Sequence, residues 1–248
     1  MNHTAALRPT PFLQWLTDFN VRFRFKFILP QRRLARVDGL KLDISRLSSY
    51  MKNNVLEGRY EKQERRMVEK HLTPQDRVLE LGGAIGYISL YCQCILGIRQ
   101  YTTVEANPAT AEILRKNHAL NGSSAPVWNL AAAQEDGELD LDIGAEFWTN
   151  SIVTSSGGRK VRVPCLSLPS ILAKLTYSPT TLIADIEGAE QYLDFAAIPK
   201  DLTKIIIELH PDMIGEAKVR EIQANLAHLG FEQVEEEAGT FVYLRGGH

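Results

Sequence analysis

The sequence predicts an α/β protein with a doubly wound, mostly parallel sheet of seven strands, an N-terminal extension and a β-rich insertion. Apolar runs alternate with helix-like segments from residue 60 onwards, which is typical of a parallel sheet with helices on both faces. A glycine-rich turn at 82–86 joins one apolar strand to a helix. Two later strands each end in ionisable residues, as expected where the carboxyl ends of parallel strands form a ligand crevice.

The predicted elements follow one another regularly. Residues 37–45 contain a turn at Asp38-Gly39 and a short alternating strand, and a polar stretch then leads to Gly58. Periodicity and breaker residues predict helices at 60–71, 87–96, 109–120, 166–175, 192–198 and 219–229. Strands are expected at 77–81, 101–104, 126–132, 181–184 and 204–207, with two more between 230 and 244. Residues 138–165 alternate around Gly157-Gly158, which predicts a β-rich insertion or hairpin.

The N-terminal segment is basic and aromatic. Residues 21–27 alternate strictly, with Phe on one face and Arg or Lys on the other, which predicts an edge strand or arm that covers the body with its Phe face. A contact with an anionic membrane and a lid over an acidic substrate are the alternatives. Residues 1–41 hold eight Lys or Arg and two Asp, about +6, and the rest of the chain carries about −8.

Composition places the chain among ordinary globular proteins. It has 248 residues, of which 44% are hydrophobic and 23% charged, and its net charge of −2 gives no general attraction to nucleic acid. Three cysteines cannot form a paired framework, so Cys92, Cys94 and Cys165 are interpreted as buried thiols in a reducing compartment. No apolar run approaches membrane-spanning length and the N-terminus lacks a signal-peptide core. These features predict a cytoplasmic protein.

The glycine turn indicates a nucleotide-type pocket. Residues 80–86 read Glu-x-Gly-x-Ala-x-Gly, which differs from the Gly-x-Gly-x-x-Gly of dinucleotide-binding folds. The next strand delivers Glu105, whose carboxylate can accept hydrogen bonds from both hydroxyls of a ribose, and Asn107-Pro108 starts the following helix. The alternative is a tight strand-to-helix turn without a ligand.

A group of ionisable residues follows the fourth and fifth predicted strands. Its members are Asp185, Glu187, Glu190, Glu208 and His210, and such a concentration is costly unless the groups bind cations, share protons or take part in chemistry. His210 is the first choice as a general base for a hydroxyl, and Asp185 is the second. Alternatively, the acids cap the next helix and His210 only turns the chain before Pro211.

Together these segments resemble the FkbM-type family of S-adenosylmethionine-dependent methyltransferases. The family pairs a glycine turn with Asp-x-Glu-Gly-x-Glu at the fourth strand and Glu-x-His after the fifth, found here at 185–190 and 208–210. Residues 58–61 and 104–108 are similar to two further family segments, and the likeness runs from about residue 37 to the end. Members often carry a lysine where Ile183 stands and another small residue in place of Gly83.

The resemblance implies a class I methyltransferase fold, S-adenosylmethionine as cofactor, and methylation of hydroxyl groups on sugars or natural products. Residues 1–50 would form an accessory segment or cap and residues 51–248 the catalytic domain. The catalytic residues would be His210, Asp185 and Glu208. The cofactor-binding residues would be Glu80, Gly82, Gly83, Ala84, Gly86, Tyr87, Glu105, Ala106, Asn107, Ala131, Ala132 and Asp185. The substrate-binding residues would be Tyr60, Glu61, Trp148, Asn150, Ser151 and Glu187.

Several alternatives stay open. A divalent metal held by Asp185, Glu187, Glu208 and His210 is less favoured, because the sequence shows no ligand spacing on one element. The expected acceptor is a small-molecule or glycosidic hydroxyl and not nucleic acid. Pro164-Cys165 is superficially similar to the Pro-Cys pair of cytosine-C5 methyltransferases, but it lies outside the fourth-strand motif, and the body of the chain is acidic. A nucleic-acid methyltransferase and a catalytically silent cofactor-binding scaffold are the competing functions, and a homo-oligomer is not excluded.

Overall fold

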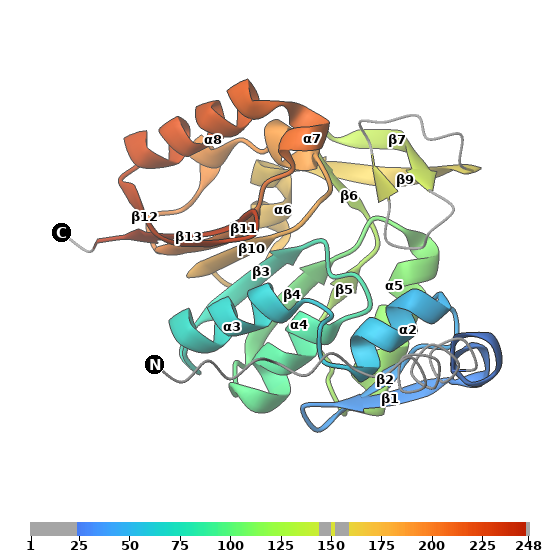
Figure 1. Ribbon diagram of the computed structural model, residues 1–248. Coiled ribbons are helices and arrows are strands. Elements are labelled where there is room, and N and C mark those ends of the chain that lie inside the picture. Colours follow the sequence, from blue (N-terminus) through green and yellow to red (C-terminus); the bar gives the residue numbers. More distant parts are fainter. Residues whose placement is uncertain (1–23, 144–149, 152–158, 247–248) are drawn as a thin grey trace, which may run out of the picture.

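The computed structural model describes residues 24–143, 150–151 and 159–246. Figure 1 shows a central sheet between two layers of helices. The sheet has seven strands in the order β12-β13-β11-β10-β3-β4-β5, and only β13 runs antiparallel to its two neighbours. The predicted doubly wound, mostly parallel sheet is therefore confirmed. Its strands are β3 (Arg77–Leu81), β4 (Gln100–Val104), β5 (Val127–Trp128), β10 (Thr181–Ala184), β11 (Lys204–Glu208), β12 (Phe231–Glu237) and β13 (Thr240–Arg245).

The central strands are apolar on both faces because each face packs against a separate core. In β10, Ile183 contributes to one core while Leu182 and Ala184 contribute to the other. The neighbouring β11 alternates in the same way, with Ile206 on one face and Ile205 and Ile207 on the opposite one. Such continuous apolar runs are expected for a parallel sheet that is buried on both sides.

The helices divide between these two faces. Figure 1 places α3 (Lys62–His71), α4 (Tyr87–Leu90) and α5 (Pro108–Leu120) on one side of the sheet, and α6 (Leu168–Lys174) and α8 (Glu216–His228) on the other. The start of α5 is well defined in the sequence, because Asn107 caps it by accepting a hydrogen bond from Ala109 N, and Pro108 occupies its first turn. Four further helical elements are short: η3 (Tyr91–Ile95), η4 (Ala189–Tyr192), η5 (Phe195–Ala197) and α7 (Pro211–Ile214).

The N-terminal extension packs onto α5. Strands β1 (Leu34–Val37) and β2 (Leu40–Asp43) form a hairpin around Asp38-Gly39, as predicted. The side chain of Asn121 accepts a hydrogen bond from Lys41 N (2.8 Å) and donates one to Lys41 O (2.7 Å), which joins β2 to the end of α5. The expected polar stretch contains a helix, α2 (Ser49–Leu56), that begins at the Ser48 cap. The domain boundary at residue 50 stays a prediction.

The predicted strand at 21–27 is wrong for the part that is described. Residues 24–28 form a π-helical turn, η1 (Arg24–Ile28), which η2 (Leu29–Gln31) continues. A strand needs a neighbour for its backbone hydrogen bonds, and among the described residues no strand pairs with this segment. The side chain of Phe27 is about half exposed, and those of Phe23 and Phe25 lie outside what the structure describes, so the predicted Phe-lined contact with the body stays a prediction.

The predicted β-rich insertion is present as a second sheet. Its four strands, in the order β6-β9-β7-β8, are β6 (Ala131–Ala133), β9 (Arg159–Ser167), β7 (Gly137–Ile143) and β8 (Asn150–Ser151). The strand expected at 126–132 is divided between the two sheets, because Asn129 interrupts it. The Asn129 amide donates hydrogen bonds to Glu105 O (2.9 Å) and Ala106 O (3.0 Å), so the chain leaves β4 at this point.

Two smaller expectations are corrected. Cys92 and Cys165 are buried, but Cys94 is exposed, because residues two positions apart on a helical turn do not share a face. The helix expected at 192–198 is absent: η4 ends at Tyr192, and only the 3₁₀ turn η5 lies within the range. Asp194 starts η5 by accepting a hydrogen bond from Ala196 N, an alternative to continuous helix that Asp commonly offers. In the described part of the chain, no helix has the length and apolar character needed to cross a membrane.

Candidate functional site

The glycine turn after β3 is packed tightly against both neighbouring strands. Gly82 has φ +87°, and a Cβ there would lie 1.7 Å from Asp185 O. A Cβ on Gly83 would lie 2.0 Å from Thr103 Cγ2. Both glycines donate backbone hydrogen bonds to Val104 O, at 2.9 and 3.0 Å. These positions therefore require glycine for close approach to β4 and β10.

Glu105 holds the glycine turn against the start of α5. One carboxylate oxygen accepts a hydrogen bond from Ala84 N (2.9 Å) and the other from Asn107 N (2.8 Å). The side chain is only 7% exposed, and burial raises its pKa to about 7 although these two bonds act in the opposite direction. Each oxygen still has a lone pair that a ligand hydroxyl can use.

A cavity of about 240 Å³ opens at the carboxyl ends of β3, β4 and β10. This is where ligands bind in open α/β sheets. Ten of the predicted site residues line it: Tyr60, Glu61, Gly82, Ala84, Glu105, Ala106, Ala131, Ala132, Asp185 and Glu187. The other lining residues were not predicted from the sequence; they are Leu47, Met51, Ile85, Val104, Thr110, Leu130, Leu141, Ile186 and Ala189.

The remaining predicted site residues have other positions. Gly83, Gly86, Tyr87, Asn107, Glu208 and His210 do not line the cavity, although they adjoin residues that do. Glu80 is buried behind the turn and accepts a hydrogen bond from Thr103 Oγ1 (2.7 Å). Trp148 lies outside the described residues, and Asn150 and Ser151 form β8, of which only the backbone is described.

Strained backbone conformations gather at this cavity. In the described ranges, five non-glycine residues have positive φ, and three of them line the cavity: Glu61 (+46°), Ala84 (+44°) and Glu187 (+50°). The other two, Asp38 and Ala238, precede a glycine in hairpin turns, where this conformation is expected. Residues held in costly conformations cluster at functional sites, so the strain supports the assignment of this cavity.

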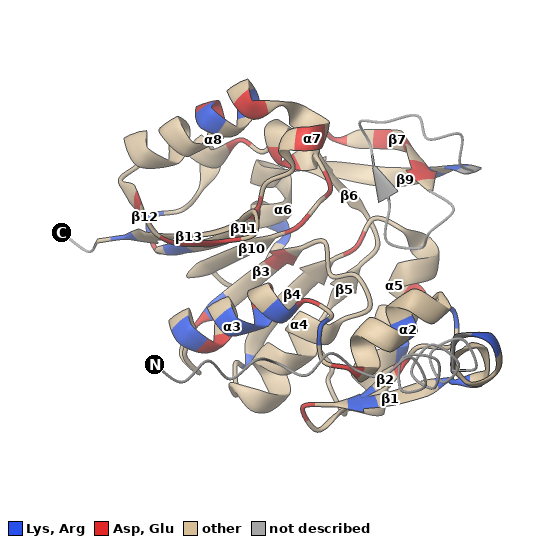
Figure 2. Cartoon of the chain, viewed as in Figure 1, with Lys and Arg blue, Asp and Glu red and all other residues tan. Residues whose placement is uncertain are grey.

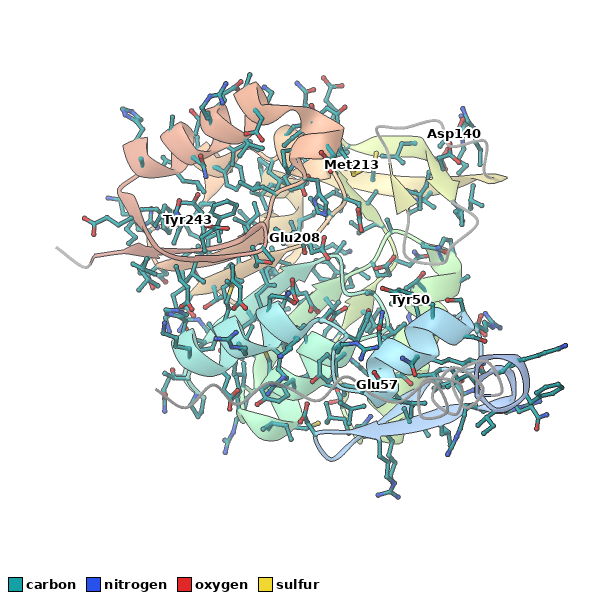
Figure 3. All side chains as sticks on the ribbon, viewed as in Figure 1. Tyr50, Glu57, Asp140, Glu208, Met213 and Tyr243 are labelled. Atoms are coloured by element: carbon teal, nitrogen blue, oxygen red, sulfur yellow. The ribbon has the colours of Figure 1, made fainter. Side chains whose placement is uncertain are left out.

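The predicted acid and histidine group is brought together beside the cavity. His210 Nε2 lies 3.5 Å from Glu187 Oε2, 3.6 Å from Asp185 Oδ1 and 3.8 Å from Glu208 Oε1. Its Nδ1 contacts a carboxylate oxygen of Glu190, which is fully buried. Glu208, labelled in Figure 3, ends β11 near the middle of the molecule. The end of β11 and the segments that follow β10 and β11 therefore bring five residues together, which we call the acid–histidine cluster: Asp185, Glu187, Glu190, Glu208 and His210.

Electrostatic coupling determines the charge of the acid–histidine cluster. Burial lowers the pKa of His210, but the hydrogen bond to Glu190 and the nearby carboxylates outweigh it and raise the pKa to about 9. Burial and the charges of Glu208 and Glu187 raise the pKa of Asp185 well above its usual value. Burial together with Glu64 raises the pKa of Glu208 to about 7. At neutral pH, His210 is therefore an imidazolium beside two carboxyl groups, Asp185 and Glu208, whose pKa values are raised.

Part of this cluster has the ligand types of a metal site. One ligand atom each from Asp185, Glu187 and His210 lies within 4.8 Å of the others. The contact of Glu190 with Nδ1 of His210 leaves Nε2 facing the carboxylates of Asp185 and Glu187. In metal sites, a carboxylate on the other ring nitrogen orients a histidine ligand in the same way. The same groups can equally exchange protons with a hydroxyl.

The topology decides the fold. The strand order places β3 at the centre, β4 and β5 on one side, and β10, β11 and the antiparallel pair β13-β12 on the other. This order agrees with the seven-stranded, mostly parallel, doubly wound sheet that the sequence predicts. No family model and no curated protein matches the sequence.

Solved structures of methyltransferases are similar to this chain at low sequence identity. The FkbM methyltransferase from Methylobacillus flagellatus is 11% identical with a TM-score of 0.48, over 70% of this chain and only 44% of its own chain. The ribosomal protein L11 methylase from Lactobacillus delbrueckii is 12% identical with a TM-score of 0.47, over 76% and 80% of the two chains. A methyltransferase from Pyrococcus furiosus is 12% identical with a TM-score of 0.44, over 95% and 98%.

Proposed function

We propose that this chain is an S-adenosylmethionine-dependent O-methyltransferase that acts on a hydroxyl of a sugar or natural-product small molecule. The observation that carries the proposal is Glu105, a buried carboxylate in the cavity wall that is anchored to the glycine turn. The acid–histidine cluster, at the carboxyl ends of β10 and β11, lies beside the same cavity and can accept the proton of the acceptor. Cofactor recognition and proton transfer would then be combined at one edge of the sheet.

The chemistry of the cavity wall fits this cofactor. Glu105 can accept hydrogen bonds from both ribose hydroxyls, and apolar side chains such as Val104 and Leu130 offer contacts for a purine. Gly82 and Ala84 bring the backbone to the cavity between β3 and β10. When bound, S-adenosylmethionine supplies an electrophilic methyl group on a positively charged sulfur.

Asp185 is the member of the acid–histidine cluster best placed to accept the hydroxyl proton. It lines the cavity, and its Oδ1 is buried without a hydrogen-bond partner in the described structure. The imidazolium of His210, 3.6 Å away, lowers the pKa of Asp185 against the stronger effects of burial and neighbouring acids. His210 is thus a cation that opposes the rise in the pKa of Asp185 and favours its ionised form, instead of the neutral base expected from the sequence. His210 also lowers the pKa of Glu208, against the larger effects of burial and Glu64.

The acceptor is proposed to be a small molecule and not nucleic acid. Four acids, Glu61, Glu105, Asp185 and Glu187, line the cavity, and no Lys or Arg is among the described lining residues. Figure 2 shows basic residues on α3 and on the N-terminal extension. A phosphate backbone would need basic side chains at the site. Tyr60, Glu61 and Glu187 are the proposed acceptor contacts, to which Trp148, Asn150 and Ser151 remain predicted additions.

The experiment that tests the proposal is calorimetric titration of S-adenosylmethionine and S-adenosylhomocysteine into wild type, Glu105→Gln and Glu105→Ala. Loss of the charged acceptor should weaken binding by about 1.5–3 kcal/mol. Glu112→Ala is the matched control, because Glu112 lies on α5 with a side chain that is 69% exposed. No binding to wild type would refute the proposal, whereas binding without transfer to any hydroxyl in a substrate panel would favour the scaffold alternative.

The metal-assisted variant of the mechanism has its own test. Activity that disappears after chelation and returns with Mg²⁺ or Mn²⁺ would assign Asp185, Glu187 and His210 as ligands. Unchanged activity after chelation would support proton transfer by the carboxylates alone. A cytoplasmic location and a homo-oligomeric state remain proposals from the sequence.

A further inference from the structure

Thr110 carries a buried hydroxyl that has no partner. The residue lies in the first turn of α5, is 3% exposed and lines the cavity. Its Oγ1 atom is inaccessible and makes no hydrogen bond to any described residue. An unpaired buried hydroxyl costs free energy, so a hydroxyl retained at a cavity wall indicates a bound partner.

The other buried polar side chains of this helix and its cap are paired. Asn107 accepts a hydrogen bond from Ala109 N, and Asn117 donates one to Ile85 O (2.8 Å). His118 is hydrogen-bonded to Ser89 Oγ at 2.8 Å. Thr110 is therefore the exception along α5, and it is also the one of these residues that lines the cavity.

The position of Thr110 indicates which half of the cofactor would lie beside it. It follows Glu105 by five residues and belongs to the β4 side of the cavity, whereas Gly82 and Asp185 belong to the β3 and β10 side. If Glu105 binds the ribose, the adenosine half occupies the β4 side. We infer that the Thr110 side chain turns about χ1 in the complex, so that its hydroxyl, which is enclosed in this structure, forms a hydrogen bond with the adenosine half of bound S-adenosylmethionine. This inference rests on the proposed function.

The test compares Thr110→Val, which preserves shape and removes the hydroxyl, with wild type. S-adenosylhomocysteine should bind the variant about three- to tenfold more weakly in calorimetry. The melting temperature of the ligand-free variant should rise by about 2–4 °C, because the unpaired group is gone. Thr181→Val is the matched control: Thr181 is fully buried but donates to Asp76 Oδ1 (3.1 Å), so its loss should lower the melting temperature and leave the affinity unchanged.

A second probe locates the contact. 5′-Methylthioadenosine lacks the amino-acid end of the cofactor, so Thr110→Val should weaken its binding by the same factor, and Thr110→Ser should restore the affinity for both ligands. Equal affinity of wild type and Thr110→Val for S-adenosylhomocysteine would overturn the inference while leaving the proposed function intact. An effect seen with S-adenosylhomocysteine but absent with 5′-methylthioadenosine would overturn the adenosine assignment. Failure of wild type to bind either ligand would refute the proposed function itself.

Discussion

Replacing Glu80 by Gln should make the protein more stable at alkaline pH without disturbing the cavity. Glu80 is 3% exposed, and Thr103 Oγ1 donates a hydrogen bond to it behind the glycine turn. Burial raises its pKa from 4.5 to about 8, although the bond to Thr103 acts in the opposite direction. A glutamine has nearly the same shape, can still accept the bond from Thr103, and carries no charge.

The magnitude follows from the linkage between folding and proton binding. The folded-state pKa lies above the unfolded value, so the folded protein holds the proton more tightly and this stabilisation is lost as the pH rises from 4.5 through 8. A difference of about 3.5 pKa units corresponds to about 5 kcal/mol at pH 9. Glu80→Gln avoids this loss, so its advantage in unfolding free energy should grow from near zero at pH 4.5 towards that value.

The assay is urea unfolding of both proteins at intervals between pH 4.5 and 9. Glu112→Gln, with an exposed side chain, is the control and should follow the wild-type curve at every pH. The reasoning fails if the wild-type and Glu80→Gln curves remain parallel across this range. Because Glu80 does not line the cavity, we also expect the variant to bind S-adenosylhomocysteine with wild-type affinity.

Two further predictions concern the turn and the acid–histidine cluster. Gly83→Ala places a methyl group 2.0 Å from Thr103 Cγ2, so it should lower the unfolding free energy, measured with urea, by about 1–3 kcal/mol and weaken cofactor binding, measured by calorimetry. Gly246→Ala is the control, because its methyl group lies in open space and should change neither quantity. His210→Gln removes a cation that lowers the pKa of Asp185 and Glu208, so the acidic limb of the kcat profile should shift upward by about one pH unit or more. Complete loss of activity at every pH would instead identify His210 as the base.

Local sequence patterns predicted the parts of the fold whose cause is local. The apolar run of β3 and the glycines after it were recognised because a strand, a positive-φ turn and a helix start each leave a residue signature. The start of α5 was predicted from Asn107-Pro108 for the same reason. Glu105 followed from its place at the end of β4. Gly82, Ala84 and Glu105 were therefore accessible from the sequence, whereas Ile85, Val104 and Thr110 on the same elements were missed.

The parts that were missed depend on tertiary contacts. Helix α2 has Met51 and Val55 on one face but also carries Lys52, which is buried and donates to Pro30 O (3.0 Å). Because lysine side chains are usually exposed, the sequence did not indicate that this face of α2 is buried. Leu47 and Met51 consequently escaped the site prediction. The Ser48 cap, which accepts a hydrogen bond from Met51 N, was the available signal.

The charge of His210 in the acid–histidine cluster could not be predicted from the sequence. The residues were identified, and parallel strand topology explains why they meet, but the sequence assigned His210 a neutral state. Its contact with the fully buried Glu190 reverses that assignment, because a carboxylate without access to water favours the imidazolium. An imidazolium cannot accept the hydroxyl proton, whereas it can favour the ionised form of Asp185 at the cavity wall. The proposed choice of Asp185 as base thus depends on one buried contact between η4 and the residues after β11.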